Sequence, residues 1–117
     1  MRMWMVDPSI LCRKHLLGEH AETHMFAGCL RKRMKLDGYV VVNALELSLL
    51  KQRHEDLARE MIARGYRHQS PLPDFDTDYL SAKVKASEVD IIKSQELLFG
   101  RCWECWENYI RARKEVG

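Results

Sequence analysis

The sequence predicts an all-α fold, a compact single domain of three or four helices over residues 1–117 with an extended N-terminal arm. Residues 14–35 contain no proline, and their apolar side chains recur near helical spacing. The β-prone run at residues 39–42 is too short to support a sheet alone. A length of 117 residues suits one domain with a single modest core.

The N-terminal third is expected to contain the arm and the longest helix. Residues 1–6 read as a short strand or an extended arm. Asp7-Pro8-Ser9 is typical of a turn or helix start, because Asp caps and Pro is tolerated at the first helical position. Residues 14–35 then predict a helix of about six turns, and the turn signal at Asp37-Gly38 ends it.

A second helix is predicted to begin at Asn43, with Glu46 as its capping-box partner, and to end at Gly65 as the C′ glycine. Residues 66–82 contain prolines and several aspartates, which predict a surface loop.

A third helix is predicted to start at Ser87, with Asp90 in its first turn, and to end at Gly100. Its expected core face consists of Val89, Ile91, Ile92, Leu97 and Leu98. Residues 103–114 predict a last short helix, so the elements together indicate a small helical domain.

Composition indicates a soluble globular protein, with 46% hydrophobic and 31% charged residues. No apolar run approaches a membrane span, and the N-terminus lacks the long apolar segment of a signal peptide. We therefore expect an intracellular protein whose four cysteines are reduced. A net charge of +2 argues only weakly for nucleic acid, although residues 31–35 form a basic run.

The histidine and cysteine patterns admit metal binding without requiring it. His20 and His24 are one helical turn apart, but the zinc-protease pattern needs Glu directly after the first His, so two exposed histidines are the expected interpretation. Cys102 and Cys105 have zinc-knuckle spacing without a second close pair in sequence. Cys12 and Cys29 would complete a site only by folding nearby. We therefore predict packing roles, no bound metal and no cofactor, with a metal or redox module as an alternative.

Trp103, Trp106 and Tyr109 recur at helical spacing near the C-terminus. Core packing is the default interpretation of such a stripe. A platform on which bases stack is the functional alternative.

Several motifs resemble the small phage and viral pyrimidine-dimer DNA glycosylases of the endonuclease V type. His15-Leu16-Leu17, followed by Glu19 and Glu22, looks like that family's His-Leu-x-x-Glu-x-x-Glu helix, and Arg2 precedes it at a similar spacing. Leu30-Arg31-Lys32 matches the basic end of that helix. Residues 50–53 and 63–66 resemble the family's second helix and its Arg-Gly-aromatic stop. The likeness covers most of the chain and is weaker after Gly65.

The resemblance implies an enzyme whose nucleophile is the α-amine of the first residue, here Met1, assisted by the carboxylate of Glu22. The amine would attack C1′ of a damaged nucleotide and form an imine, and β-elimination would then cut the strand. An α-amine suits this role because its reference pKa is about 7.7–8.0, against about 10.4 for lysine. Met1 is expected to be retained, because Arg2 is too large for the usual removal of the initiator residue.

The resemblance also implies a partner, double-stranded DNA containing a damaged base, bound by a monomer in the cytoplasm of a bacterial or phage-infected cell and away from membranes. The residues expected to contact DNA are Arg2, His15, Arg31, Arg33, Arg64, Trp103 and Trp106. Ala21 and Met25 stand where the family has arginines that grip the duplex. The alternative function is a catalytically inactive helical DNA-binding protein of the same fold.

Overall fold

The computed structural model describes residues 1–68 and 70–116, and within them the chain is helical, without strands. The helices, in order, are η1 (Pro8–Ile10), α1 (Arg13–Arg31), α2 (Asp37–Val41), η2 (Leu47–Leu49), α3 (Leu50–Ala63), α4 (Ala82–Lys85), α5 (Ile91–Arg101) and α6 (Trp103–Val116). The predicted all-α class is confirmed. Within this part of the chain, no helix is long and apolar enough to cross a membrane.

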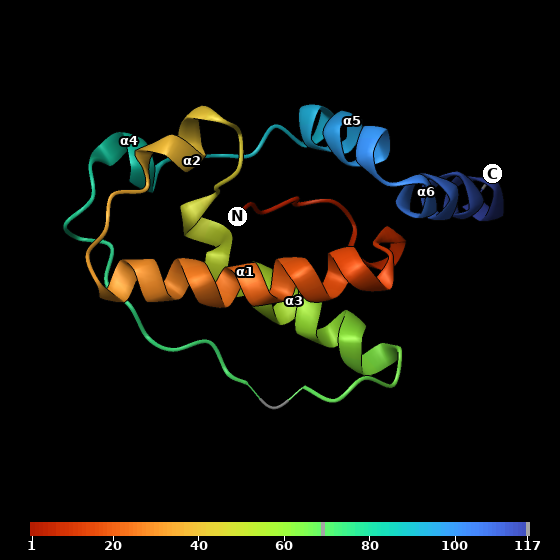
Figure 1. The fold of residues 1–117 in the computed structure, drawn as a ribbon, viewed down its shortest axis with the longest axis horizontal. Coiled ribbons are helices and arrows are strands. Elements are labelled where there is room, and N and C mark those ends of the chain that lie inside the picture. The colour runs from red at the N-terminus through yellow and green to blue at the C-terminus, as the bar shows by residue number, and fades with distance from the viewer. Residues whose placement is uncertain (69, 117) are drawn as a thin grey trace.

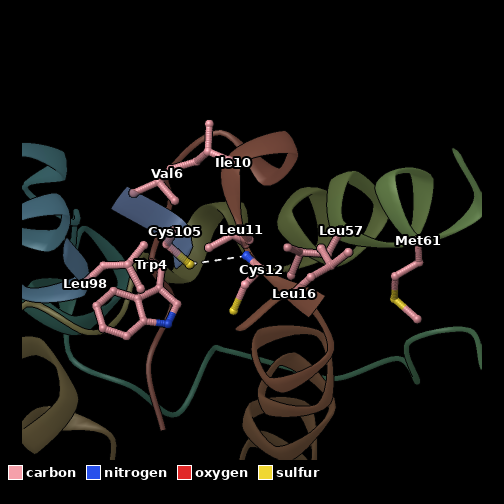
Figure 2. Close-up of a cluster of buried hydrophobic side chains, with 10 residues drawn as sticks. All are labelled: Trp4, Val6, Ile10, Leu11, Cys12, Leu16, Leu57, Met61, Leu98 and Cys105. Carbon is pink, nitrogen blue, oxygen red and sulfur yellow. Dashed lines mark hydrogen bonds between the residues drawn. The ribbon is translucent and has the colours of Figure 1, made fainter. Parts of the chain in front are cut away.

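Helices α1 and α3 form the centre of the molecule, where α3 crosses α1 (Figure 1). Helices α5 and α6 lie on the side of the N-terminal half of α1. One core cluster surrounds Leu16 of α1 and Leu57 of α3 and includes Leu98 of α5 (Figure 2). A second cluster surrounds Phe26 and Leu30 near the other end of α1. The long α1 therefore joins both halves of the core.

The N-terminal arm is extended, as predicted, and it is part of the core. Met3, Trp4 and Val6 are almost completely buried. The backbone N–H of Met3 donates to the carbonyl of Ala44 at 2.8 Å, and the hydroxyl of Ser94 donates to the carbonyl of Trp4 at 2.6 Å. Because α5 and the segment before α3 both hold this arm, the first residues have a fixed position.

Local signals predicted several helix ends correctly. Asp7 caps η1 by accepting a hydrogen bond from the Ser9 N–H at 2.9 Å. Gly65 follows α3 with φ +84, the left-handed conformation that a C′ glycine adopts easily.

The first helix ends at Arg31, earlier than the predicted Lys35, because Arg33 leaves the helix with φ 56.

The predicted start of the second helix is wrong. Asn43 and Glu46 do not form a capping box, and helical structure begins only at Leu47. The Asn43 side chain instead accepts from the N–H of Asp90 at 2.7 Å and donates to its carbonyl at 3.0 Å. Glu46 accepts from the N–H of Val89 at 2.8 Å. These two residues therefore fix the start of α5, far away in sequence.

The third predicted helix needs similar corrections. Asp90, and not Ser87, caps α5, and the helix continues past Gly100 to Arg101. Ile91 and Ile92 are exposed, so they do not belong to its core face. The β-prone residues 39–42 lie in and just after the short helix α2. The predicted loop after Gly65 is confirmed up to α4, apart from Gln69, which lies outside the described residues.

Candidate functional site

A pocket of about 440 Å³ opens beside the N-terminal arm. It is lined by Met1, Arg2, Trp4, Lys14, His15, Gly18, Glu19, Glu22 and Arg101. Four of the residues predicted from the sequence to function, Met1, Arg2, His15 and Glu22, therefore meet in one place. The arm and one face of α1 supply most of the lining, and α5 adds Arg101.

Glu22 lies at the start of the chain. One oxygen of its carboxylate accepts a hydrogen bond from the backbone N–H of Arg2 at 3.2 Å. This contact joins residues twenty positions apart and places the carboxylate one residue from the Met1 α-amine. Met1 and Glu22 line the same open pocket, an arrangement in which a carboxylate can assist an attack by the α-amine.

Glu19, one turn before Glu22, has a different role. It forms a bidentate ion pair with Arg53 of α3, with N···O distances of 2.6 and 2.9 Å. Arg53 also donates to the carbonyl of Val6 at 2.7 Å. Burial raises the pKa of Glu19, while Arg53 and the backbone amides of Trp4 and Met5 oppose that rise. The pair thus holds the arm against α1 and α3 and fixes Met1 and Arg2 at the pocket.

The pocket is rich in positive charge. Arg2 stacks over the Trp4 ring at 5.0 Å, and its pKa is lowered by burial and by the nearby charge of Arg101. Arginine remains protonated despite such a shift. Burial and the charge of Lys14 lower the pKa of His15, so its imidazole is neutral near pH 7. Phosphate groups are attracted to such a concentration of cations.

Sequence reasoning missed Lys14, Arg53 and Arg101. Arg53 falls inside a stretch that resembles a known helix, but nothing in its local pattern marks it as the partner of Glu19. Arg101 lies in the region where the resemblance is weak, and only the tertiary fold brings it to the pocket.

The other predicted DNA-contacting residues lie away from this pocket. Arg31 and Arg33 are exposed, and Arg33 contacts Asp78 at 3.7 Å and stacks over Tyr79. Arg64 donates to Glu60 at 2.8 Å and to the Leu11 carbonyl at 2.8 Å, so it stabilises the chain around η1. Its role on DNA stays a prediction.

The two tryptophans of α6 are placed differently from each other. Trp103 is 71% exposed at the start of the helix, whereas Trp106 packs against Phe99 with ring centroids 5.4 Å apart. Both residues border a separate hollow of about 360 Å³ that also includes Arg111 and Lys114. Trp103 is therefore available for stacking with a base, and that role also stays a prediction.

Cys102 and Cys105 have close neighbours that the sequence did not reveal. Cys12 and His15, at the start of α1, lie beside them, and the candidate ligand atoms of all four residues are within 4.8 Å of one another. Of the two cysteines that would complete a site only by folding nearby, Cys12 does lie beside the pair, whereas Cys29 takes no part. Burial raises the pKa of the Cys12 and Cys105 thiols, whereas at Cys102 hydrogen bonds outweigh burial and lower the pKa of the thiol.

The expectation that His20 and His24 are simply exposed is also wrong. His20 is 9% exposed, and the ring nitrogens of His20, His24, His54 and His68 lie within 4.8 Å of one another. Burial, together with the neighbouring histidines, lowers the pKa of His20 to about 4. This cluster joins α1, α3 and the following loop.

The chain is similar to a known protein family. A family model described as pyrimidine dimer DNA glycosylase matches residues 1–74, which is more than half of the chain. The matched part contains the arm, α1 and α3, and with them Met1, Arg2, Glu19, Glu22 and Arg53. No curated protein and no solved structure matches the chain.

Proposed function

This chain belongs to the pyrimidine dimer DNA glycosylase family, and from that premise we propose that it excises a damaged pyrimidine and then cuts the strand, using the Met1 α-amine. The family supports a DNA glycosylase in general terms. The observation that carries the finer proposal is the hydrogen bond between the Arg2 N–H and Glu22 at 3.2 Å. It supports a catalytic pair of amine and carboxylate at the open pocket.

The chemistry begins with attack of the neutral amine on C1′ of the damaged nucleotide. The C1′–N bond to the base breaks, and the base leaves with its electron pair and takes up a proton. Glu22 stabilises the positive charge that develops on the sugar. The sugar ring then opens to an imine, loss of a C2′ proton follows, and β-elimination breaks the C3′–O bond of the strand.

The remaining pocket residues serve to hold the DNA. Arg2 and Arg101 present guanidinium groups that suit bidentate contact with phosphates on either side of the lesion. Lys14 adds a third cation at the rim. Since a base inside a duplex cannot reach the pocket, the damaged nucleotide or its partner must leave the stack during binding.

Borohydride trapping tests the nucleophile. The protein is incubated with duplexes carrying a pyrimidine dimer or an abasic site and is reduced, and peptide mapping then locates the attached sugar. Intact mass of the same preparation establishes whether the chain begins at Met1. We expect the sugar on the Met1 amine, and attachment to an internal lysine would refute the proposal.

Glu22→Gln tests the carboxylate. We expect single-turnover excision to fall by at least about 100-fold, the usual lower bound for a positioned acid–base group, while folding and binding of dimer-containing DNA are retained. Glu96→Gln is the matched control, because Glu96 is an exposed carboxylate outside the pocket. Equal excision rates for the two variants would show that Glu22 does not act. Tight DNA binding without trapping in the wild type would favour the inactive DNA-binding alternative.

A further inference from the structure

We propose that Cys12, His15, Cys102 and Cys105 bind one zinc ion, which ties the start of α1 to the junction of α5 and α6. The four residues come from two segments about ninety positions apart. Cys102 and Cys105 lie beyond residue 74, where the family match ends, so the match does not imply this site.

The distances suit tetrahedral coordination. Zinc binds cysteine sulfur at about 2.3 Å and histidine nitrogen at about 2.0–2.1 Å, so neighbouring ligand atoms are expected to be about 3.5–3.8 Å apart. The sulfur atoms of Cys12 and Cys102 are 3.8 Å apart. Nδ1 of His15 lies 3.8 Å from the Cys105 sulfur, within this range, and 3.1 Å from the Cys12 sulfur, which a bound ion would have to push apart by about half an ångström. A disulfide would need about 2.05 Å between the sulfur atoms.

Backbone N–H groups support each sulfur. The N–H of His15 donates to the Cys12 sulfur at 3.4 Å, and that of Cys105 donates to the Cys102 sulfur at 3.4 Å. The N–H of Cys12 donates to the Cys105 sulfur at 3.2 Å, a contact drawn in Figure 2. Hydrogen bonds of this kind stabilise thiolates, the form of cysteine that binds metal.

The two pairs share a local geometry. Cys12 precedes α1 and Cys102 precedes α6, and each is followed three positions later by its partner within the first turn. Residues at these positions lie on the same face of the turn, so each segment presents two ligands together. All four coordination positions would be filled by protein, which is the arrangement of a structural zinc ion.

The ion would also fix two residues of the pocket. His15 lines the pocket, and Arg101 precedes Cys102 and lines it as well. Binding through Nδ1 would set the His15 tautomer, with the proton on Nε2. The zinc site therefore supports the pocket without taking part in its chemistry.

Elemental analysis of protein purified without chelator tests the proposal, with Cys105→Ser as the test variant and Cys29→Ser as the matched control. Cys29 is the cysteine outside the cluster. We expect Cys105→Ser to lose one zinc per chain and Cys29→Ser to lose none. With Co²⁺ in place of zinc, wild type and Cys29→Ser should show thiolate-to-metal charge-transfer absorption, and Cys105→Ser should show it weakened or absent.

A measurement on the wild type avoids the risk that Cys105→Ser fails to fold. With zinc bound, a thiol reagent should modify Cys29 readily and Cys102 slowly, and a strong chelator should raise the reactivity of Cys102. Cys12 and Cys105 are buried with or without the ion, so their reactivity is not the readout. Wild-type protein that binds neither Zn²⁺ nor Co²⁺ through sulfur would overturn the proposal. Equal zinc loss in Cys29→Ser and Cys105→Ser would overturn it too.

A different set of contacts carries a second proposal, that His20, His24, His54 and His68 bind another Zn²⁺ ion. Together the two clusters contain all five histidines of the chain. Nε2 of His20 lies 2.7 Å from Nε2 of His68, and Nε2 of His54 lies 3.1 Å from that of His24. All four rings therefore turn the same nitrogen inward.

The surroundings of His54 add to this argument. Its other nitrogen, Nδ1, lies 3.0 Å from the carboxylate of Glu55. Metal-binding histidines commonly donate their second ring N–H to a carboxylate, which orients the ring and increases its basicity. Four neutral imidazoles suit zinc and similar transition metals.

His68→Gln tests the second site, because His68 lies on a loop where a substitution leaves the core intact, and Arg67→Gln is the neighbouring control. We expect two zinc ions per chain in the wild type and in Arg67→Gln, and one in His68→Gln. The remaining ion should keep its cobalt–thiolate absorption, since His68 is not part of the cysteine site. A wild type with one zinc, retained in His68→Gln and lost in Cys105→Ser, would overturn this second site alone.

Discussion

Replacing Arg53 with methionine should cost more stability than any surface substitution on α3. Arg53 is 4% exposed and Glu19 is 1% exposed, and the two groups form a bidentate pair at 2.6 and 2.9 Å. The variant leaves the Glu19 carboxylate buried without its partner and the Val6 carbonyl without its donor. Breaking a buried pair in this way costs about 3–5 kcal/mol, a large part of the roughly 5–15 kcal/mol that stabilises a domain.

The assay is urea unfolding followed by circular dichroism, supported by thermal melting. At about 4 °C per kcal/mol for a domain of this size, the midpoint should fall by roughly 12–20 °C. Arg59→Met is the control on the same helix, because Arg59 forms only an exposed pair with Asp56 at 3.4 Å. Such pairs contribute about 0–1 kcal/mol. A loss below about 1 kcal/mol for Arg53→Met would refute the claim that this pair holds the core.

Combining Arg53→Met with Glu19→Leu separates stability from activity. The double variant removes the unpaired buried charge, so much of the stability should return. The arm would still lack the Arg53 contact with Val6 and the Glu19 contacts with the amides of Trp4 and Met5. We therefore expect excision to stay low. Recovery of both properties would show that the pair does not position the arm.

Two further substitutions test the DNA-facing surface and the link to α5. Ala21→Arg places a cation at an exposed position of α1, where the family has an arginine. It should tighten binding to dimer-containing DNA and steepen the log–log salt dependence of the binding constant by up to about one unit, measured by titration across a salt series. An unchanged slope would mean that residue 21 faces away from the DNA. Asn43→Ala removes both hydrogen bonds to Asp90 and should lower the free energy of unfolding by about 1–3 kcal/mol, measured by urea unfolding. An unchanged free energy of unfolding would mean that water replaces the two hydrogen bonds.

Sequence patterns predicted the features that depend on neighbouring residues. The periodicity of α1, the Asp7 cap and the Gly65 stop are all local, and each was found in the structure. The same reasoning failed for Asn43 and Glu46, which match a capping box in sequence but bind the start of α5 instead. A side chain that can cap a helix can equally satisfy a distant backbone group, and local pattern cannot separate the two.

In the candidate site, too, the residues related by local spacing were predicted and those brought in by the tertiary fold were not. Met1, Arg2, His15 and Glu22 could be found because helical spacing and a family resemblance relate them. The sequence could not identify Arg53 and Arg101 as site residues, because their partners lie far away in sequence. The cysteine cluster had a usable signal in its two Cys-x-x-Cys/His pairs, each at a helix start. The pairs are about ninety residues apart, so only the fold shows that they meet.

The positions of side chains around the axis of α1 decide which of the two proposed zinc sites, the one at His15 or the one at His20, affects the pocket. At about 100° per residue, His15, Glu19 and Glu22 fall within about 60° of one another around the helix, while His20 and His24 lie roughly 150° away. His15, Glu19 and Glu22 line the pocket, and Glu22 also binds the arm, whereas His20 and His24 contact His68 of the loop and His54 of α3 and do not line the pocket. Loss of the ion at His15 should therefore disturb the position of Arg101 and slow excision. Loss of the ion at His20 should loosen the α1–α3 contact and lower stability while leaving the pocket geometry intact.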